Sequence, residues 1–253
     1  MHIETTGTGP PLVLVHGWAM HGGLFAPLVA RLRERHTLHV VDLPGHGHAR
    51  DDDAALDPRA LAAQLVARIP GAAWLGWSLG GQLALHAALD HPQAVRAVIP
   101  VASSPRFVRA DDWPHGVAPT LFGDFADALR RDFRGTLDGF LALEVAGSEH
   151  ARRELRELRA QAFERGEPAP RALLDGLALL DAVDLRDALP RLPVPSLWIA
   201  GARDRLVPAG AMQAAADPCG GRCEVIAGAG HAPFVGDPDA VASAIDAFLA
   251  PLL

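Results

Sequence analysis

Short apolar runs alternate with segments of helical periodicity along most of the chain. In the helical segments, apolar residues recur every three or four positions, as in helices that pack one face on a core. The apolar runs are short and are bounded by glycine, proline and polar turn residues, as buried strands are. We expect helices at 24–35, 58–69, 79–90, 208–216 and 238–250, and strands within 11–15, 37–47, 72–76, 95–103, 195–201 and 222–228.

This alternation predicts an α/β fold. Strands that are apolar along their whole length, such as the run at 11–15, are buried on both faces. Strands of this kind form parallel sheets, because helical crossovers cover both faces of such a sheet. We therefore expect a mostly parallel sheet with helices on both faces.

One interval breaks the alternation. Residues 104–183 have helical patterns without a convincing strand, and they contain six of the nine phenylalanines. We expect a helical lid at 104–183, inserted between the fourth and fifth strands of a core made of residues 1–103 and 184–253. Open α/β sheets bind ligands beyond the carboxyl ends of their strands, where such a lid would form a roof. The six phenylalanines are Phe107, Phe122, Phe125, Phe133, Phe140 and Phe163.

Composition and charge narrow the functional classes. The chain is 49% hydrophobic and 21% charged, enough for a large core, and its net charge of −7 disfavours nucleic-acid binding. No run approaches the roughly 20 apolar residues of a membrane span, and the first residues lack a signal-peptide pattern. Cys219 and Cys223 give neither a metal-ligand pattern nor a disulfide framework. We expect a cytoplasmic monomer without a metal or other cofactor, and without nucleic-acid or membrane partners.

The segment GWSLGG, residues 76–81, carries the clearest chemical signal. It places Ser78 in a G-x-S-x-G pattern between an apolar strand and a helix. A tight turn there exposes the serine hydroxyl, and the glycines allow close backbone approach. The helix start also offers free N–H groups and partial positive charge to an oxyanion. The bare pattern occurs in helix starts without chemical meaning, but this strand–turn–helix context favours a nucleophile.

A serine nucleophile needs a base, and the base needs an acid to orient it. Among the 12 histidines, His231 lies in a loop directly after the last predicted strand, and Asp204 follows the strand within 195–201. Ser78, Asp204 and His231 thus occur in the chain order of one class of catalytic triad. The alternative for Asp204 is a turn cap or the partner of a neighbouring arginine.

Structural roles fit several nearby residues better than catalysis. His16 ends the first strong apolar run, where we expect it to stabilise a turn. His46 and His48 lie in a polar loop, where we expect them to be solvated. Asp237 and Asp239 follow His231 and are typical of a helix start.

Two backbone N–H groups are the expected oxyanion donors. One belongs to Leu79, directly after Ser78, and the other to Trp18, in the loop after the first strand. Donors of this kind typically contribute on the order of 3 kcal/mol to transition-state stabilisation. Because both are backbone groups, substituting the side chains would not remove them.

Five motifs occur in the order and at the spacing found in the α/β-hydrolase superfamily. They are HGW at 16–18, DLPGHG at 42–47, GWSLGG at 76–81, GARD at 201–204 and GHAPF at 230–234. The chain resembles this superfamily over nearly its whole length. The resemblance implies that Ser78 is the nucleophile with Asp204 and His231 as its partners, and that Trp18 and Leu79 lie at the oxyanion.

Further segments resemble the esterases that cleave the methyl ester of pimeloyl-[acyl-carrier protein] in biotin synthesis. They are WLGWSLGG at 74–81, VASSPRF at 101–107, DDWP at 111–114, FLALE at 140–144 and VDLR at 183–186. This resemblance implies a serine carboxylesterase whose partner is an acyl carrier protein bearing a methyl-esterified pimeloyl chain. It also implies that the FLALE residues line the acyl chain, namely Phe140, Leu141, Ala142, Leu143 and Glu144.

Six lid arginines are a candidate contact for such a partner. Three of them share a stripe on the helix predicted at 149–165, where like charges are mildly destabilising. A local positive cluster on an acidic protein suits an acidic carrier or a phosphate. The alternative is an ordinary solvated face with local ion pairs. The six are Arg130, Arg131, Arg134, Arg152, Arg156 and Arg159.

Other functions share these motifs. A general short-chain carboxylesterase would have the same triad and a different lid, and a peptidase or carbon–carbon-bond hydrolase could have the same fold. A non-catalytic binding protein would not need to keep a triad and an oxyanion loop. Haloalkane dehalogenase chemistry would need a carboxylate in place of Ser78.

Overall fold

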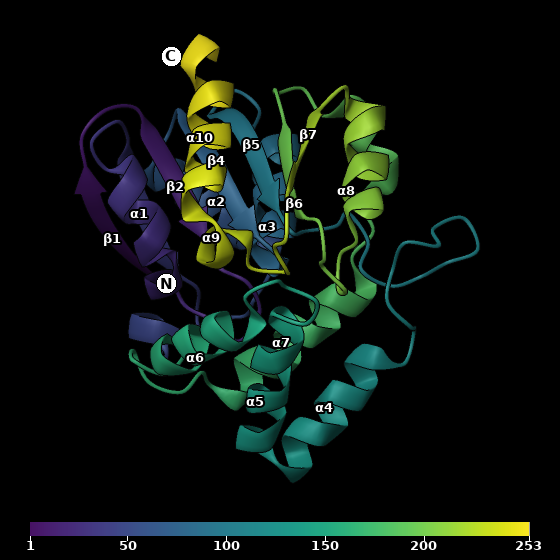
Figure 1. Ribbon diagram of the computed structural model, residues 1–253. Helices are drawn as coiled ribbons and strands as arrows, with labels where there is room; N and C mark the ends of the chain where they lie inside the picture. The colour runs from purple at the N-terminus through teal and green to yellow at the C-terminus, as the bar shows by residue number, and fades with distance from the viewer. Residues whose placement is uncertain (253) are drawn as a thin grey trace.

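A seven-stranded sheet with helices on both faces forms the core of the computed structural model, which describes residues 1–252 (Figure 1). The strand order is β1-β3-β2-β4-β5-β6-β7, and every neighbouring pair is parallel except β1 with β3. The predicted α/β fold is confirmed. The strands are β1 (His2–Gly7), β2 (Pro11–Val15), β3 (Thr37–Asp42), β4 (Ala72–Trp77), β5 (Val95–Val101), β6 (Leu197–Gly201) and β7 (Arg222–Ile226).

The edge strand β1 is an element that the sequence pattern did not predict. Its residues, HIETTG, are exposed or half-buried, and they pair antiparallel with β3 from His2 opposite Asp42 to Gly7 opposite Thr37. A strand at a sheet edge has one neighbour and is largely open to solvent. It therefore lacks the continuous apolar run that marks the inner strands.

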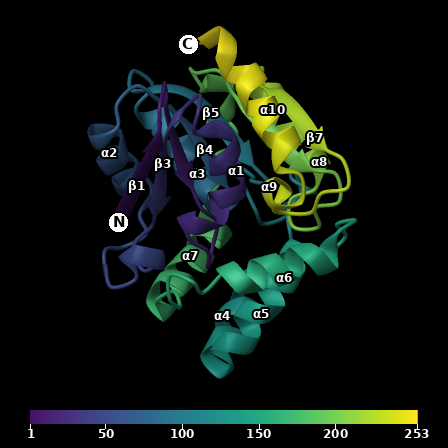
Figure 2. The ribbon, with the colours of Figure 1, turned by 60° about the vertical axis from the view of Figure 1, so that its left-hand side comes forward.

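The core helices form two layers around the sheet (Figures 1 and 2). In Figure 1, α1 and α10, which pack on one another, lie in front of the sheet, and α2 and α3 lie behind it. The main core helices are α1 (Ala26–Leu32), α2 (Pro58–Arg68), α3 (Leu79–Asp90), α8 (Ala209–Ala216), α9 (Pro233–Gly236) and α10 (Pro238–Leu249). Short 3₁₀ helices are η1 (Gly22–Phe25), η2 (Gly47–Ala49), η3 (Arg186–Arg191), η4 (Asp217–Cys219) and η5 (Ala250–Leu252).

Two of these helices start as their sequences indicate. The Asp57 side chain accepts hydrogen bonds from the N–H groups of Arg59 and Ala60 at the start of α2. The Asp237 side chain accepts one from Ala240 at the start of α10. A proline follows each aspartate and needs no N–H partner, so both helix starts are well defined.

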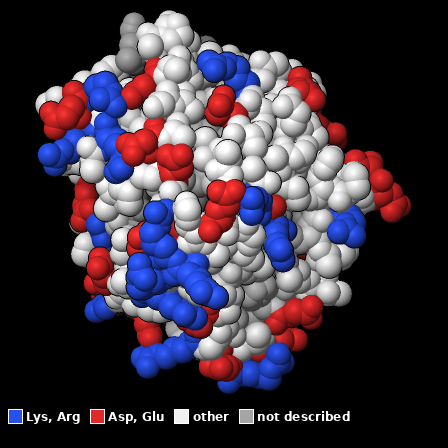
Figure 3. Space-filling view, viewed as in Figure 1, with Lys and Arg blue, Asp and Glu red and all other residues white. Residues whose placement is uncertain are grey.

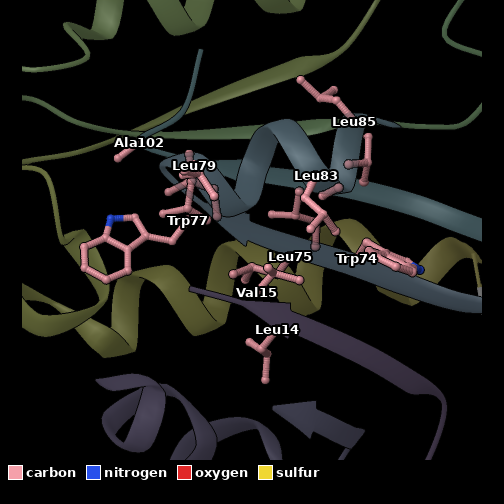
Figure 4. Close-up of a cluster of buried hydrophobic side chains, with 14 of the residues drawn as sticks. Leu14, Val15, Trp74, Leu75, Trp77, Leu79, Leu83, Leu85 and Ala102 are labelled. Carbon is pink, nitrogen blue, oxygen red and sulfur yellow. The ribbon is translucent and has the colours of Figure 1, made fainter. Parts of the chain in front are cut away.

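The central strands are buried along their length (Figure 4). All six residues of β4 are buried, and Trp74, Leu75 and Trp77 have no exposed surface. Leu14 and Val15 of β2 are equally buried. Burying such side chains contributes roughly 1.5–3 kcal/mol each. This burial fixes β4 in the sheet and thereby fixes the point at which the chain turns into α3.

Four helices lie between β5 and β6 and form a separate layer, below the sheet in Figures 1 and 2. They are α4 (Leu121–Arg131), α5 (Phe133–Glu144), α6 (Ala151–Gln161) and α7 (Pro170–Ala182). We call these four helices and the loop before them, residues 102–182, the lid. None of the helices in residues 1–252 combines the length and the apolar character needed to cross a bilayer.

A buried ion pair joins the lid to the core. Asp42, at the end of β3, has no exposed surface and accepts hydrogen bonds from the N–H groups of Gly22 at 2.6 Å and His48 at 2.9 Å. Its remaining partner is Arg165, which follows α6 and lies 3.0 Å away. Arg165 also pairs with Glu4 of β1 at 2.7 Å. One lid guanidinium thus contacts two core strands.

We predict that Arg165→Gln lowers the free energy of unfolding by about 2 kcal/mol, because it leaves the Asp42 carboxylate buried without its cation. Urea unfolding followed by circular dichroism measures the change. The matched control is Arg134→Gln, which breaks an exposed lid pair with Glu167 and should cost less than about 0.5 kcal/mol. Equal small losses in both variants would show that the buried pair does not stabilise the lid on the core.

Candidate active site

The turn between β4 and α3 holds Ser78 in a strained backbone conformation, with φ of 54° and ψ of −119°. The surrounding glycines explain how the chain tolerates this turn. A Cβ on Gly76 would clash with the carbonyl of Gly80, and a Cβ on Gly80 would clash with the carbonyls of Val15 and His16 in β2 and its loop. Only glycine lets these segments approach so closely.

Hydrogen bonds from the end of β5 hold the turn in place. The Ser78 N–H donates to the Val101 carbonyl at 2.9 Å, and the Ser103 hydroxyl donates to the Ser78 carbonyl at 2.7 Å. Ser78 is the N-cap residue of α3, yet its side chain makes no capping bond. The hydroxyl is therefore free for another partner.

That partner is His231, and Asp204 lies behind it. The Ser78 Oγ is 3.0 Å from His231 Nε2, and His231 Nδ1 is 2.7 Å from Asp204 Oδ2. All three side chains are buried. With the proton on Nδ1 facing the carboxylate, Nε2 can accept the serine proton. The structure thus brings together the three residues that the chain order singles out, in the hydrogen-bonded line that a serine hydrolase needs.

Backbone contacts position both members of the His231–Asp204 pair. The His231 N–H donates to the Glu144 carbonyl at 2.8 Å, and Trp77 Nε1 donates to the His231 carbonyl at 2.8 Å. Asp204 Oδ1 accepts hydrogen bonds from the N–H groups of Leu206 and Val207. Asp204 therefore caps its own turn with one oxygen and contacts His231 with the other, so the cap does not prevent it from acting as the partner of His231.

The site favours a protonated imidazole. Burial by itself would lower the pKa of His231, but the negative charges of Asp204 and Glu144 and the hydrogen bond to Asp204 outweigh it and raise the pKa to about 9. In a serine hydrolase, the imidazolium forms when the histidine accepts the serine proton during the attack. The carboxylates therefore stabilise the charge that develops on His231.

Trp18 and Leu79, the expected oxyanion donors, lie in the two segments next to Ser78. Leu79 is the first residue of α3, where backbone N–H groups lack helical partners. Trp18 follows Gly17, whose Cα lies so close to Ser78 that an added Cβ would be 3.1 Å from the serine Cβ. The Trp18 N–H makes no hydrogen bond within residues 1–252. His16 holds this loop, because its two ring nitrogens bond the Gly17 carbonyl and the Leu43 N–H.

An apolar cavity opens beside Ser78 and His231. Its other lining residues are all apolar and come mainly from the lid. Within this lining, Trp18 packs edge-on against Phe140, with ring centroids 4.7 Å apart. The apolar lining suits an uncharged group. The apolar lining comprises Trp18, Phe107, Val117, Leu121, Phe122, Phe125, Phe140, Leu177, Leu180 and Leu206.

The structure corrects the expected role of the FLALE segment. Phe140 lines the cavity, but Leu141, Ala142, Leu143 and Glu144 do not. A helix presents only one face to a neighbouring space, so five consecutive residues of α5 cannot all reach it. Leu141 is buried in the core cluster, and Glu144 lies beside the triad. The cavity also takes side chains from α4 and α7. Phe122 and Phe125 of α4 are among the lid phenylalanines noted in the sequence, whereas the leucines of α7 were not singled out.

The structure also shows where three histidines that we expected to be non-catalytic lie. His16 has the expected structural role, since burial lowers its pKa to about 3 and both its ring nitrogens are hydrogen-bonded. The prediction that His46 is solvated was wrong, because lid residues 169–172 cover its loop and its ring packs 5.1 Å from that of His16. His48 is exposed, as expected.

The six lid arginines are all exposed, but they differ in their partners. Arg159 forms a two-pronged pair with Asp138, and Arg130 and Arg134 pair with Asp127 and Glu167. The other three form no ion pair within residues 1–252. Half of the predicted cluster is therefore neutralised locally, and the arginines with free charge are Arg131, Arg152 and Arg156.

Comparison with known proteins places the chain among hydrolases. The family model of the alpha/beta hydrolase fold matches residues 10–238. A protein of Stenotrophomonas maltophilia named pimeloyl-[acyl-carrier protein] methyl ester esterase is 58% identical over 253 residues, which are 100% of this chain and 97% of that protein. A protein of the same name from Xanthomonas campestris pv. campestris is 56% identical over 253 residues, which are 100% of this chain and 100% of that protein.

Solved structures share the fold at much lower identity. An esterase from Exiguobacterium antarcticum superposes with a TM-score of 0.88 at 23% identity, covering 98% of this chain and 95% of that one. The enol-lactonase from Burkholderia xenovorans superposes with a TM-score of 0.85 at 21% identity, covering 98% and 96%. These likenesses support the fold and not a substrate.

The packing of the nucleophile turn predicts that Gly76→Ala destabilises the protein by about 3 kcal/mol, because the added Cβ clashes with backbone that cannot move. It should also lower the rate at which a fluorophosphonate labels Ser78. The control is Gly139→Ala, where the new Cβ on α5 meets nothing and stability should change by less than about 1 kcal/mol. Normal stability and labelling in Gly76→Ala would refute the packing argument.

Proposed function

The chain belongs to the α/β-hydrolase fold family, and we propose that it is a serine carboxylesterase that hydrolyses the methyl ester of pimeloyl-[acyl-carrier protein] in biotin synthesis. The products are pimeloyl-[acyl-carrier protein] and methanol. The observation that carries this proposal is the hydrogen-bonded line Ser78–His231–Asp204 at the side of an apolar cavity. Full-length relatives of that name, at 56–58% identity, support the substrate.

Acylation follows from the geometry. The ester carbonyl carbon takes the Ser78 oxygen while His231 Nε2, 3.0 Å away, accepts the serine proton. The tetrahedral oxyanion is held by the N–H groups of Trp18 and Leu79. His231 then donates its proton to the methoxy oxygen, which leaves as methanol, and an acyl ester on Ser78 remains.

Deacylation repeats these steps with water. His231 removes a proton from a water molecule as its oxygen attacks the acyl ester, and the same two N–H groups hold the second oxyanion. His231 returns the proton to Ser78, which restores the enzyme. Asp204 keeps Nδ1 protonated throughout and stabilises the imidazolium in both halves of the reaction. The protein residues account for each proton transfer, so the reaction needs no cofactor.

The cavity explains why a methyl ester would be chosen over a free acid. Each methylene of the acyl chain buried on the apolar lining contributes about 0.8 kcal/mol. A carboxylate in the same place would lose most of its hydration among apolar side chains, and within residues 1–252 His231 is the one lining group that could offer it a compensating charge. The uncharged ester therefore enters readily, and the charged product is disfavoured there.

The exposed arginines provide a surface for the carrier. Figure 3 shows a cluster of basic side chains over α6, on a face where acidic groups are otherwise scattered. Arg152 and Arg156 of α6 form no ion pair within residues 1–252 and are free to meet an acidic partner. Arg131 lies on α4 and is also free. This surface belongs to the lid, whose inner side forms the cavity, so one layer would hold both the carrier and its chain.

Intact-protein mass spectrometry tests the reaction. Methyl pimeloyl carrier protein incubated with the wild type should lose the mass of one methylene group, and the Ser78→Ala variant should leave it unchanged. Brisk cleavage of a small soluble ester with no change in the carrier substrate would contradict the proposal and leave a general carboxylesterase.

Charge reversal tests the carrier surface. We predict that Arg152→Glu combined with Arg156→Glu raises KM for the carrier substrate roughly tenfold or more, because attraction to an acidic carrier becomes repulsion. The kinetics with a small methyl ester should not change. Arg68→Glu combined with Arg96→Glu, at two exposed arginines of the core, gives the same change in net charge and is the control. Equal effects of the two changes would exclude a specific carrier surface on α6.

A further inference from the structure

Glu144 has an unusual environment for a carboxylic acid. It is the last residue of the lid helix α5 and is only 1% exposed. Its Oε2 is buried and has no hydrogen-bond partner within residues 1–252. A buried polar atom without a partner is costly, and such atoms are rare in native proteins. The cavity does not explain it, because Glu144 does not line that space.

The backbone of Glu144 contacts the triad directly. Its carbonyl accepts the His231 N–H at 2.8 Å, and a Cβ placed on Gly230 would lie 3.0 Å from the same carbonyl oxygen. The end of α5 and the histidine loop are therefore in close contact. Trp77 holds the other side of His231 through its carbonyl.

Few charged groups surround the Glu144 carboxyl. His231 and Asp204 are the two titratable groups whose charges act on it. Two arginines, Arg203 and Arg205, belong to the Asp204 loop, but their side chains are exposed, and Arg203 pairs with Glu149 at 2.6 Å. Within residues 1–252, His231 is the one cation whose charge acts on the Glu144 carboxyl.

We propose that Glu144 is a positioning residue of the reaction. Its backbone carbonyl ties the end of α5 to His231, and its carboxylate stabilises the positive charge of the His231 imidazolium. Asp204 sets the tautomer from the Nδ1 side. Glu144 adds a second negative charge that is available only when it has lost its proton. The lid thereby contributes to the basicity of the histidine as well as to the cavity.

The electrostatics of the site agree with this role. Burial raises the pKa of Glu144 to about 7, with the charge of His231 opposing the rise and that of Asp204 adding to it. Above that pH the carboxylate is present and helps to raise the pKa of His231. Because His231 acts as a base only when neutral, a higher pKa moves the onset of activity to higher pH. Removing the Glu144 charge must therefore move the onset to lower pH.

The test measures how fast a fluorophosphonate labels Ser78 as a function of pH, since this reaction needs neutral His231 and no natural substrate. In Glu144→Gln, which keeps size and removes the charge, the acidic midpoint of the rate profile should fall by about one pH unit. The control is Glu154→Gln, another buried lid glutamate, which bonds Ser148 and not the triad. Its profile should coincide with that of the wild type.

Coincident profiles of Glu144→Gln and wild type would overturn the proposal, as would an upward shift. If the amide variant does not fold, Glu144→Met removes the same charge and must shift the midpoint in the same direction. The inference rests on the triad of the proposed function but not on its substrate. Loss of labelling at every pH in the wild type would contradict the triad itself, whereas failure on methyl pimeloyl carrier protein alone would leave this result unaffected.

Discussion

The tight turn from β4 into α3 is the constraint on which the rest of the structure depends. Burial of β4 between two helical layers fixes where the strand ends, and Gly76 and Gly80 allow the chain to reverse within contact distance of β2. Ser78 is held there at a positive φ with its hydroxyl unused by the helix. The parallel strands β6 and β7, beyond β5 in the same sheet, then deliver Asp204 and His231 to the same edge, because each residue follows the carboxyl end of its strand.

The lid contributes to the chemistry as well as to the shape of the cavity. Its inner face supplies most of the apolar lining, its outer face carries the unpaired arginines, and its helix α5 ends on the backbone of His231. The buried Arg165–Asp42 pair fastens this layer to the sheet. In the proposed function, the lid would therefore contact the substrate chain, the carrier protein and the catalytic base.

The sequence predicted a structural feature best where a single local property, such as a continuous apolar run or a glycine at a fixed spacing, determines that feature. Continuous apolar runs revealed the inner strands, and glycine spacing together with chain order revealed Ser78, Asp204 and His231. The edge strand β1 gave no such signal, since it is largely exposed. The burial of His46 and the true cavity lining depend on how the lid packs over distant loops, which local pattern cannot encode. The partners of the arginines also depend on contacts between helices, as the Arg159–Asp138 pair illustrates.

The covalent intermediate is the most direct test of this account. Enzyme in excess is mixed with methyl pimeloyl carrier protein, quenched with acid at millisecond intervals, digested and analysed by tandem mass spectrometry. The account predicts an acyl ester on the Ser78 peptide that links enzyme and carrier, appears with the release of methanol and decays to free pimeloyl carrier protein. Release of methanol while Ser78 stays unmodified at every time, or acylation of another residue, would contradict it.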